Sequence, residues 1–164
     1  MIRKACRSHD GVEVDTQGDA FFFAFPSAPG ALEAAWDMTE ALASGPIQVR
    51  IGPHTGTPLL TDEGYIGDDV HLGARIAACA HGGQVVVSSA SAGLVNAVLT
   101  DLGEHRLKDI QYAVPIFQLR MQSFPPLKTI ANTNLPRPAS SFVGRSSSSR
   151  RYSRDSRAEH AWSR

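Results

Sequence analysis

Alternation of apolar and polar residues near the start of the chain predicts a β-hairpin. Val12 and Val14 alternate with polar neighbours, which is typical of a half-buried strand. Residues 16–19, Thr-Gln-Gly-Asp, then predict a tight turn whose glycine can adopt a positive φ angle. The apolar run 20–25 predicts a buried returning strand, so Asp19 is expected at the tip of the hairpin. A carboxylate at that position is either an ordinary turn residue or a metal ligand.

The remaining periodicity predicts alternating helices and strands. Apolar residues at helical spacing predict the end of a helix over 2–9 and helices over 32–42, 67–80 and 91–98. Alternating or β-branched runs predict strands over 47–51, 84–88, 102–108 and 115–119, and residues 57–64 are expected to form a loop. This order gives two βαβ-type units on an antiparallel sheet, which is an α+β fold.

Composition divides the 164-residue chain into three parts. Residues 1–120 have the ordinary apolar content of a globular domain. Residues 121–145 contain several prolines with polar spacers and predict an extended linker. Residues 146–164 are rich in serine and arginine and predict a disordered tail. The tail has no series of aromatic residues on which RNA bases could stack, so we expect no specific nucleic acid as a partner.

Charge and hydropathy exclude several other classes of protein. The formal net charge is zero, which argues against a general binder of nucleic acids or other polyanions. No apolar run approaches the roughly 18 residues that a membrane span needs, and no secretory signal is evident. Cys6 and Cys79 are the only cysteines, so we expect both to be reduced and buried in a cytoplasmic protein.

Three further motifs accompany the hairpin and carry a family resemblance. They are Arg50-Ile-Gly-Pro-His-Thr-Gly56, Gly67-Asp-Asp-Val-His-Leu-Gly-Ala-Arg75 and Leu102-Gly-Glu-His-Arg-Leu-Lys-Asp109. In this order, from about Ile2 to Leu119, the chain resembles the class III adenylate/guanylate cyclase catalytic domain. It is most similar to the actinobacterial branch that joins a cyclase-like domain to an ATPase and a DNA-binding regulator. Residues 133–145 resemble the segment that leads into that ATPase domain.

The resemblance implies a ferredoxin-like antiparallel sheet with helices on one face. It also implies that the first central strand of the family, which carries the first metal-binding aspartate, precedes Met1 and is missing from this N-terminally truncated sequence. Asp19 matches the second metal-binding carboxylate, which in the family holds Mg²⁺ or Mn²⁺. Arg75 matches the arginine that stabilises the transition state, and His71 stands where the family has asparagine.

The two residues that read the base in the family are both replaced. Asp15 falls at the position of the adenine-reading lysine, and its charge is the opposite one. Gly64, or Glu63 after a slip of one residue, falls at the position of the base-reading aspartate. For these positions a purely structural role is the alternative: Asp15 as a solvent-facing strand residue, His71 as a helix-surface residue, and Arg75 as an ion-pair partner of Asp68 or Asp69.

Three functions therefore compete. The first is a nucleotide cyclase, adenylate cyclase-like, that acts as a homodimer or a cyclase-domain heterodimer on ATP or GTP in signalling, with little or no activity because one metal ligand is absent. The second is a non-catalytic cyclase-homology module that regulates a partner. The third is a gene fragment without function. No glycine-rich phosphate loop, Cys/His cluster or Ser-His-Asp motif in the sequence indicates another enzyme class.

Overall fold

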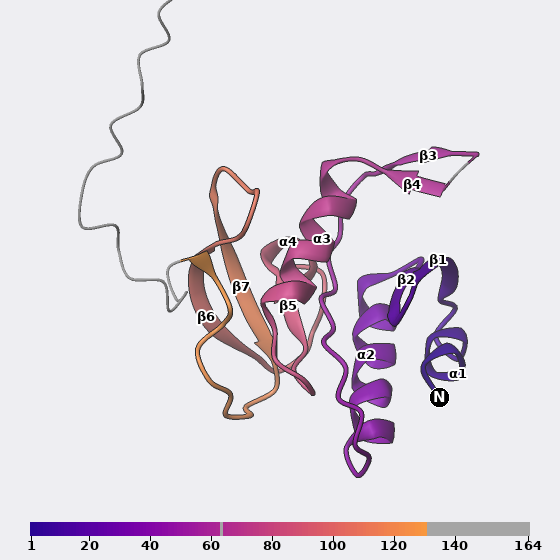
Figure 1. Cartoon of the computed structure of the whole chain (residues 1–164), viewed down its shortest axis with the longest axis horizontal. Coiled ribbons are helices and arrows are strands. Elements are labelled where there is room, and N and C mark those ends of the chain that lie inside the picture. Colours follow the sequence, from indigo (N-terminus) through magenta and orange to yellow (C-terminus); the bar gives the residue numbers. More distant parts are fainter. Residues whose placement is uncertain (63, 131–164) are drawn as a thin grey trace, which may run out of the picture. The chain divides into compact units, whose positions relative to one another are not determined.

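The computed structural model describes residues 1–62 and 64–130, so the predicted tail and most of the predicted linker lie outside the described residues. Figure 1 shows an α+β arrangement of helices and antiparallel strands. In chain order the elements are α1 (Ile2–Arg7), β1 (Val12–Gln17), β2 (Ala20–Ala24), α2 (Ala28–Leu42), β3 (Leu59–Thr61), β4 (Gly64–Ile66), α3 (Asp68–Cys79), β5 (Val86–Ser88), α4 (Ser89–Ala92), β6 (Leu99–Arg106) and β7 (Ala113–Leu119).

The predicted hairpin is present as β1 and β2. Gln17 pairs with Ala20, so the loop between them consists of two residues, and Gly18 has a φ angle of 63°. This positive φ is the conformation that the two-residue turn requires. The expected burial of the returning strand is wrong, because no residue of β1 or β2 is buried. The strands form a separate two-stranded sheet, in which Phe23 makes ring contacts with Phe21 and Phe25.

The predicted strand over 47–51 is reduced to a single parallel bridge between Ile51 and Val85. The Ile51 N–H donates to the Gln84 carbonyl, and the Ile51 carbonyl accepts from the Val86 N–H at 3.0 Å. Pro53 follows and has no N–H with which to continue the ladder, which explains why the pairing is short. Residues 49–53 are extended, and their backbone hydrogen bonds go to residues 83–88 on one side.

Two other predicted elements also differ from the structure. Residues 57–64 were expected to form a loop, but Leu59–Thr61 and Gly64–Ile66 pair as the hairpin β3–β4. The predicted helix over 91–98 is instead the short α4, which ends at Ala92. Gly93 follows as its C-cap, and both Leu94 and Val98 are exposed, so the apolar spacing there does not mark a buried helix face.

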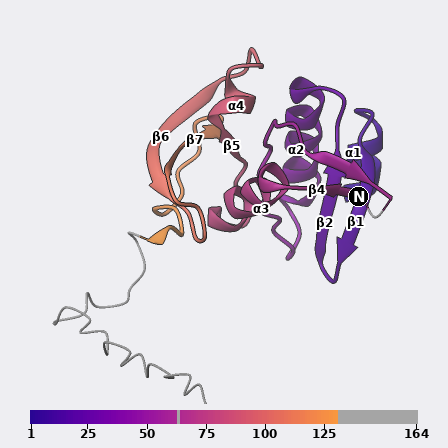
Figure 2. The same ribbon diagram turned by 90° about the horizontal axis from the view of Figure 1, so that it is seen from above.

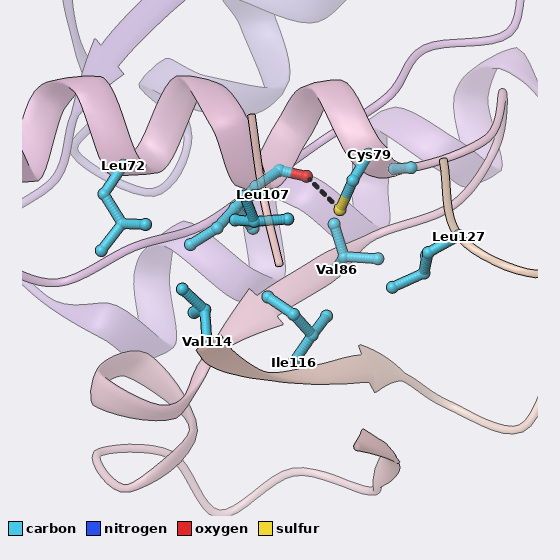
Figure 3. Packing of buried hydrophobic residues seen from close by; sticks show 9 residues of the cluster. Leu72, Cys79, Val86, Leu107, Val114, Ile116 and Leu127 are labelled. Atoms are coloured by element: carbon cyan, nitrogen blue, oxygen red, sulfur yellow. Dashed lines mark hydrogen bonds between the residues drawn. The ribbon is translucent and has the colours of Figure 1, made fainter. Parts of the chain in front are cut away.

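The largest sheet has the strand order β5-β7-β6 and is antiparallel. α3 packs against one face of β5 through a core that includes Ile76, Val86 and Ile116 (Figure 3). α2 joins a second core with Val85 and Val87. Because successive residues of a strand point to opposite faces, the two helices contact opposite faces of β5. The expectation that the helices lie on one face is therefore wrong.

The chain continues to pack beyond the predicted domain boundary at residue 120. Leu127 is buried in the core beneath α3, and the Lys128 N–H donates to the Cys79 carbonyl at 2.9 Å. The Gln118 side chain donates to the Gln122 carbonyl at 2.7 Å. Residues 121–130, which were expected to begin a linker, thus cover the end of the domain. Cys6 and Cys79 are free and buried as predicted, and burial raises the pKa of both thiols to about 11.

Candidate functional site

The first motif, residues 50–56, owes its two glycines to the close approach of α3. A Cβ atom on Gly52 would lie 2.4 Å from the Ala77 backbone nitrogen, and one on Gly56 would lie 2.2 Å from the Asp69 carboxyl carbon. At Gly52 the close atoms are backbone, so only glycine fits there, whereas at Gly56 a Cβ atom would force the Asp69 side chain to shift. These glycines fix the distance between the extended segment and α3, which carries His71 and Arg75.

His54 lies between the glycines and links three elements through its ring. Its Nδ1 is 2.9 Å from the Ser88 hydroxyl and its Nε2 is 3.2 Å from Asp69 Oδ1. A carboxylate only accepts hydrogen bonds, so Nε2 carries the proton. The other Asp69 oxygen accepts from the Thr57 N–H at 2.7 Å. The Thr57 N–H, followed by His54, holds the pKa of the Asp69 carboxyl below its usual value.

This Ser-His-Asp grouping was missed in the sequence because its members are distant along the chain. It does not have the geometry of a nucleophilic site. The Ser88 hydroxyl is buried and accepts a further hydrogen bond from the Ser91 N–H, and Asp69 is the most exposed of the three. A substrate could not reach the hydroxyl, whereas the carboxylate faces solvent. The grouping therefore holds the residue 53–57 segment to α3 and β5.

Arg75 pairs with a residue that the sequence did not indicate. Its Nη2 is 2.5 Å from Asp109 Oδ2, so the expected alternatives Asp68 and Asp69 are not its partners. The Arg75 side chain is 30% exposed, and its Nε is buried without a hydrogen-bond partner among the described residues. His71, one turn earlier on α3, is exposed. α3 thus presents both predicted residues, and one of them is already engaged in an ion pair.

Asp19 lies at the exposed tip of the β1–β2 hairpin, as predicted. Within residues 1–62 and 64–130, no three His, Cys, Asp or Glu side chains gather into a group that could hold a metal ion. One exposed carboxylate supplies too few ligands for Mg²⁺ or Mn²⁺, which are held by several oxygen atoms. The described residues therefore do not fit the two-ion site that the resemblance implies.

Asp15 and Gly64, which the resemblance places at the base-reading positions, lie on neighbouring strands. Gly64 begins β4 with a φ angle of 115°, and a Cβ atom there would be 3.4 Å from the Val14 side chain, next to Asp15 (Figure 2 shows β4 beside β1). Asp15 is exposed and sits at a bulge of β1. Its carboxylate accepts from the Thr16 N–H and from the Gln17 side chain, at 2.7 and 2.9 Å. These bonds give Asp15 a local structural role. Glu63 lies outside the described residues.

Comparison with known proteins gives partial matches. No protein-family model matches the chain. An uncharacterized protein of Mycobacterium tuberculosis is 37% identical over 159 residues, a match that covers 88% of this chain and 55% of the relative. The chain thus spans about half the length of this curated relative. An adenylate cyclase of Podospora anserina is 32% identical over 120 residues, which cover 54% of this chain and 6% of that protein.

Solved structures match a larger share of the chain. An adenylate cyclase of Trypanosoma brucei superposes with a TM-score of 0.70 at 22% identity, covering 79% of this chain and 80% of that one. An adenylate/guanylate cyclase/hydrolase from Silicibacter pomeroyi has a TM-score of 0.65 at 28% identity, covering 75% and 80%. In the part of the chain that the structure describes, no helix is both long and apolar enough to cross a membrane. The chain has the fold of the class III adenylate/guanylate cyclase catalytic domain.

Proposed function

We propose that this chain is a degenerate adenylate cyclase-like domain that binds a nucleoside triphosphate weakly and makes little or no cyclic nucleotide. The observation that carries this proposal is the Arg75 guanidinium on α3, which is 30% exposed and already holds one carboxylate, that of Asp109, through Nη2. A guanidinium fork matches the oxygens of a phosphate group whether or not chemistry follows. The motif of residues 67–75, which contains Arg75, resembles that of the family. The superposed cyclase structures share the fold of this chain.

Loss of turnover follows from the metal ligands. The family reaction uses two divalent ions, which activate the ribose 3′-oxygen and hold the triphosphate. Asp19 alone cannot hold both, and the described residues supply no group of three ligands beside it. The described residues therefore lack the ligands that a two-ion reaction requires.

We also infer weak discrimination between ATP and GTP. In the family a lysine and an aspartate read the base, whereas here Asp15 and Gly64 stand at those positions. The Asp15 carboxylate is already occupied by Thr16 and Gln17, and Gly64 has no side chain with which to contact a base. Binding should then depend on phosphate contacts and weaken as salt is added, because surface electrostatics are screened.

The binding test compares wild-type protein with Arg75→Ala by titration with ATP and GTP. Arg75→Ala should lose most of the affinity for both nucleotides, whereas the control Arg7→Ala, an exposed arginine on α1, should retain it. Equal affinity in wild type and Arg75→Ala would contradict the proposal. The same preparations, assayed with Mg²⁺ or Mn²⁺, should form no cyclic AMP or cyclic GMP above background. A turnover signal that disappears in Asp19→Ala would overturn the proposed loss of activity.

The exposed β3–β4 hairpin supports assembly with a second cyclase-like domain. Leu59, Leu60 and Ile66 are 63%, 65% and 49% exposed, although all three are large apolar residues on a short hairpin. Leu59 and Ile66 are cross-strand partners and share one face of the hairpin, whereas Leu60 lies on the other face. Exposed apolar side chains that lie together on a surface typically mark an interaction site. A homodimer or a heterodimer with a related domain would bury them. Sedimentation of wild type against Leu59→Ser/Leu60→Ser tests this, since a dimer held by the hairpin should dissociate in the double variant.

We further propose that one more strand fits beside β2 and residues 49–53. β2 pairs with β1 alone among the described strands, and residues 49–53 bond only toward β5, which leaves the backbone groups of Arg50 and Gly52 without partners among the described residues. An N-terminal extension bearing a Phe-x-Asp strand should therefore raise the melting temperature. The same extension with proline inside the strand is the control, because proline cannot donate to a ladder. Equal melting temperatures would refute this placement.

A further inference from the structure

Asp109 occupies an unusual backbone position in the loop between β6 and β7. Its φ angle is 63°, in the left-handed region that disfavours residues with a Cβ atom. Asp and Asn are tolerated there better than most residues, and glycine is favoured. Leu107, two residues earlier, is 1% exposed and belongs to the core beneath α3. The loop is thus anchored by packing, and it directs the Asp109 carboxylate at a fixed element.

The element that Asp109 meets is Arg75. Asp109 Oδ2 lies 2.5 Å from Arg75 Nη2, and this is the ion pair that Arg75 makes within the described residues. The contact uses one end of the guanidinium, because Arg75 Nε has no hydrogen-bond partner there. Because Nε is buried, a bidentate anion would instead bond both terminal nitrogens, Nη1 and Nη2. The Asp109 carboxylate therefore contacts the guanidinium but leaves part of its hydrogen-bonding capacity unused.

The pair is exposed enough to exchange. The two side chains retain 30% and 50% of their accessible surface. Ion pairs in such positions are weak and are screened by salt. A phosphate group that brings more charge and more acceptor oxygens than one carboxylate can then displace Asp109 from Arg75.

We propose that Asp109 is a built-in competitor for the phosphate-binding position at Arg75 and sets the affinity of this chain for nucleoside triphosphates. The inference rests on the proposed function, since it requires Arg75 to contact phosphate. Neutralising Asp109 frees the guanidinium and removes a negative charge from the path of an incoming triphosphate.

The test uses Asp109→Gly and Asp109→Asn in the full chain, with ATP and inorganic tripolyphosphate as probes. Glycine suits the left-handed backbone, and asparagine keeps the shape of the side chain without its charge, so both variants should fold. We expect both to bind each probe about 2- to 5-fold more tightly than wild type at low salt, as loss of an exposed ion pair allows. The gain should shrink at high salt.

Two controls separate this effect from a general change of charge. Glu104→Gln removes one exposed negative charge from β6 without touching the Arg75 pair, and it should leave affinity near the wild-type value. Arg75→Ala/Asp109→Gly should lose the gain. If Asp109→Gly binds like wild type while Arg75→Ala still binds less, the inference fails and the proposed function stands. If the gain persists without Arg75, the inference also fails. If no variant binds either probe, both fail.

Discussion

The β1–β2 hairpin and strand β5 are both rich in apolar residues but pack very differently. Every residue of β5 is buried, whereas β1 and β2 contain no buried residue. β5 lies between two cores, one formed with α3 and one with α2. The hairpin instead makes ring contacts within β2, an edge contact of Phe22 with Tyr65 in β4, and the bidentate pair of Arg3 with Glu13.

This contrast divides the candidate site. Arg75 and His71 stand on a helix that packing holds in place, and Arg75 is further held by Asp109. Asp15 and Asp19 stand on a two-stranded sheet, which is marginal by itself in water. A functional constellation requires all its members to be held to within a fraction of an ångström. In the proposed site, packing therefore supports Arg75 and His71 better than it supports Asp15 and Asp19.

The most direct test of this difference in packing is to make the same valine-to-alanine substitution in β5 and in β1. Val86→Ala in β5 removes two methyl groups from a side chain that is 0% exposed, so we expect a loss of about 2–3 kcal/mol in the free energy of unfolding. Val12→Ala in β1 changes a side chain that is 66% exposed and should cost no more than about 0.5 kcal/mol. Denaturant unfolding of both variants measures the difference. Equal losses would show that the hairpin is packed as tightly as the sheet.

Sequence reasoning succeeded where local chemistry decides the structure. The turn at Gly18, the β1–β2 hairpin and helix α3 are each determined by residues that are close together in the chain. It failed for the burial of β2, because an apolar run predicts a buried strand only when other elements are available to cover it. It failed for 57–64 because three-residue strands are too short for a periodic pattern.

The candidate site shows the same division. The sequence correctly placed His71 and Arg75 on one helix, and Asp15 and Asp19 on one hairpin. The partners were not predicted, since Asp109 lies 34 residues from Arg75 and His54 lies 34 from Ser88. A pairing of this kind is set by the packing of α3 against the sheet and leaves no periodic signal. The glycines offered one clue, since Gly52 and Gly56 fall where α3 approaches most closely.

Two glycine-to-alanine substitutions in the packed region should change the free energy of unfolding in opposite directions. Gly52→Ala places a Cβ atom 2.4 Å from the Ala77 backbone and must push α3 away, so we expect a loss of about 1–3 kcal/mol. Gly73→Ala, inside α3, meets the nearest other atom at an ordinary 3.5 Å and should stabilise the protein by about 0.5–1 kcal/mol through helix propensity. Thermal unfolding distinguishes the two, and a stable Gly52→Ala variant would mean that α3 is not held by this contact.

The smallest expected effect is the pH-dependent contribution of the Asp69 carboxylate to stability. It tests whether residues 53–57 belong to the packed region. Hydrogen bonds from Thr57 and His54 lower the pKa of Asp69 below its ordinary value of 3.8, so its charged form stabilises the folded state. That contribution is present above pH 3.8 and is lost as the pH falls through the lower pKa of the folded state. Because the side chain is about a third exposed, we expect Asp69→Asn to cost about 1 kcal/mol at pH 7.

The measurement is the free energy of unfolding of wild type and Asp69→Asn between pH 7 and pH 2.5. The two curves should approach each other as the pH falls, because the wild-type carboxyl then becomes protonated and resembles the amide. Asp68→Asn, the exposed neighbour on α3, is the matched control and should run parallel to wild type. Curves for Asp69→Asn and wild type that stay equally far apart at all pH values would show that the carboxylate charge does not hold this segment to α3. Residues 53–57 would then behave like the hairpin, fixed by local geometry alone.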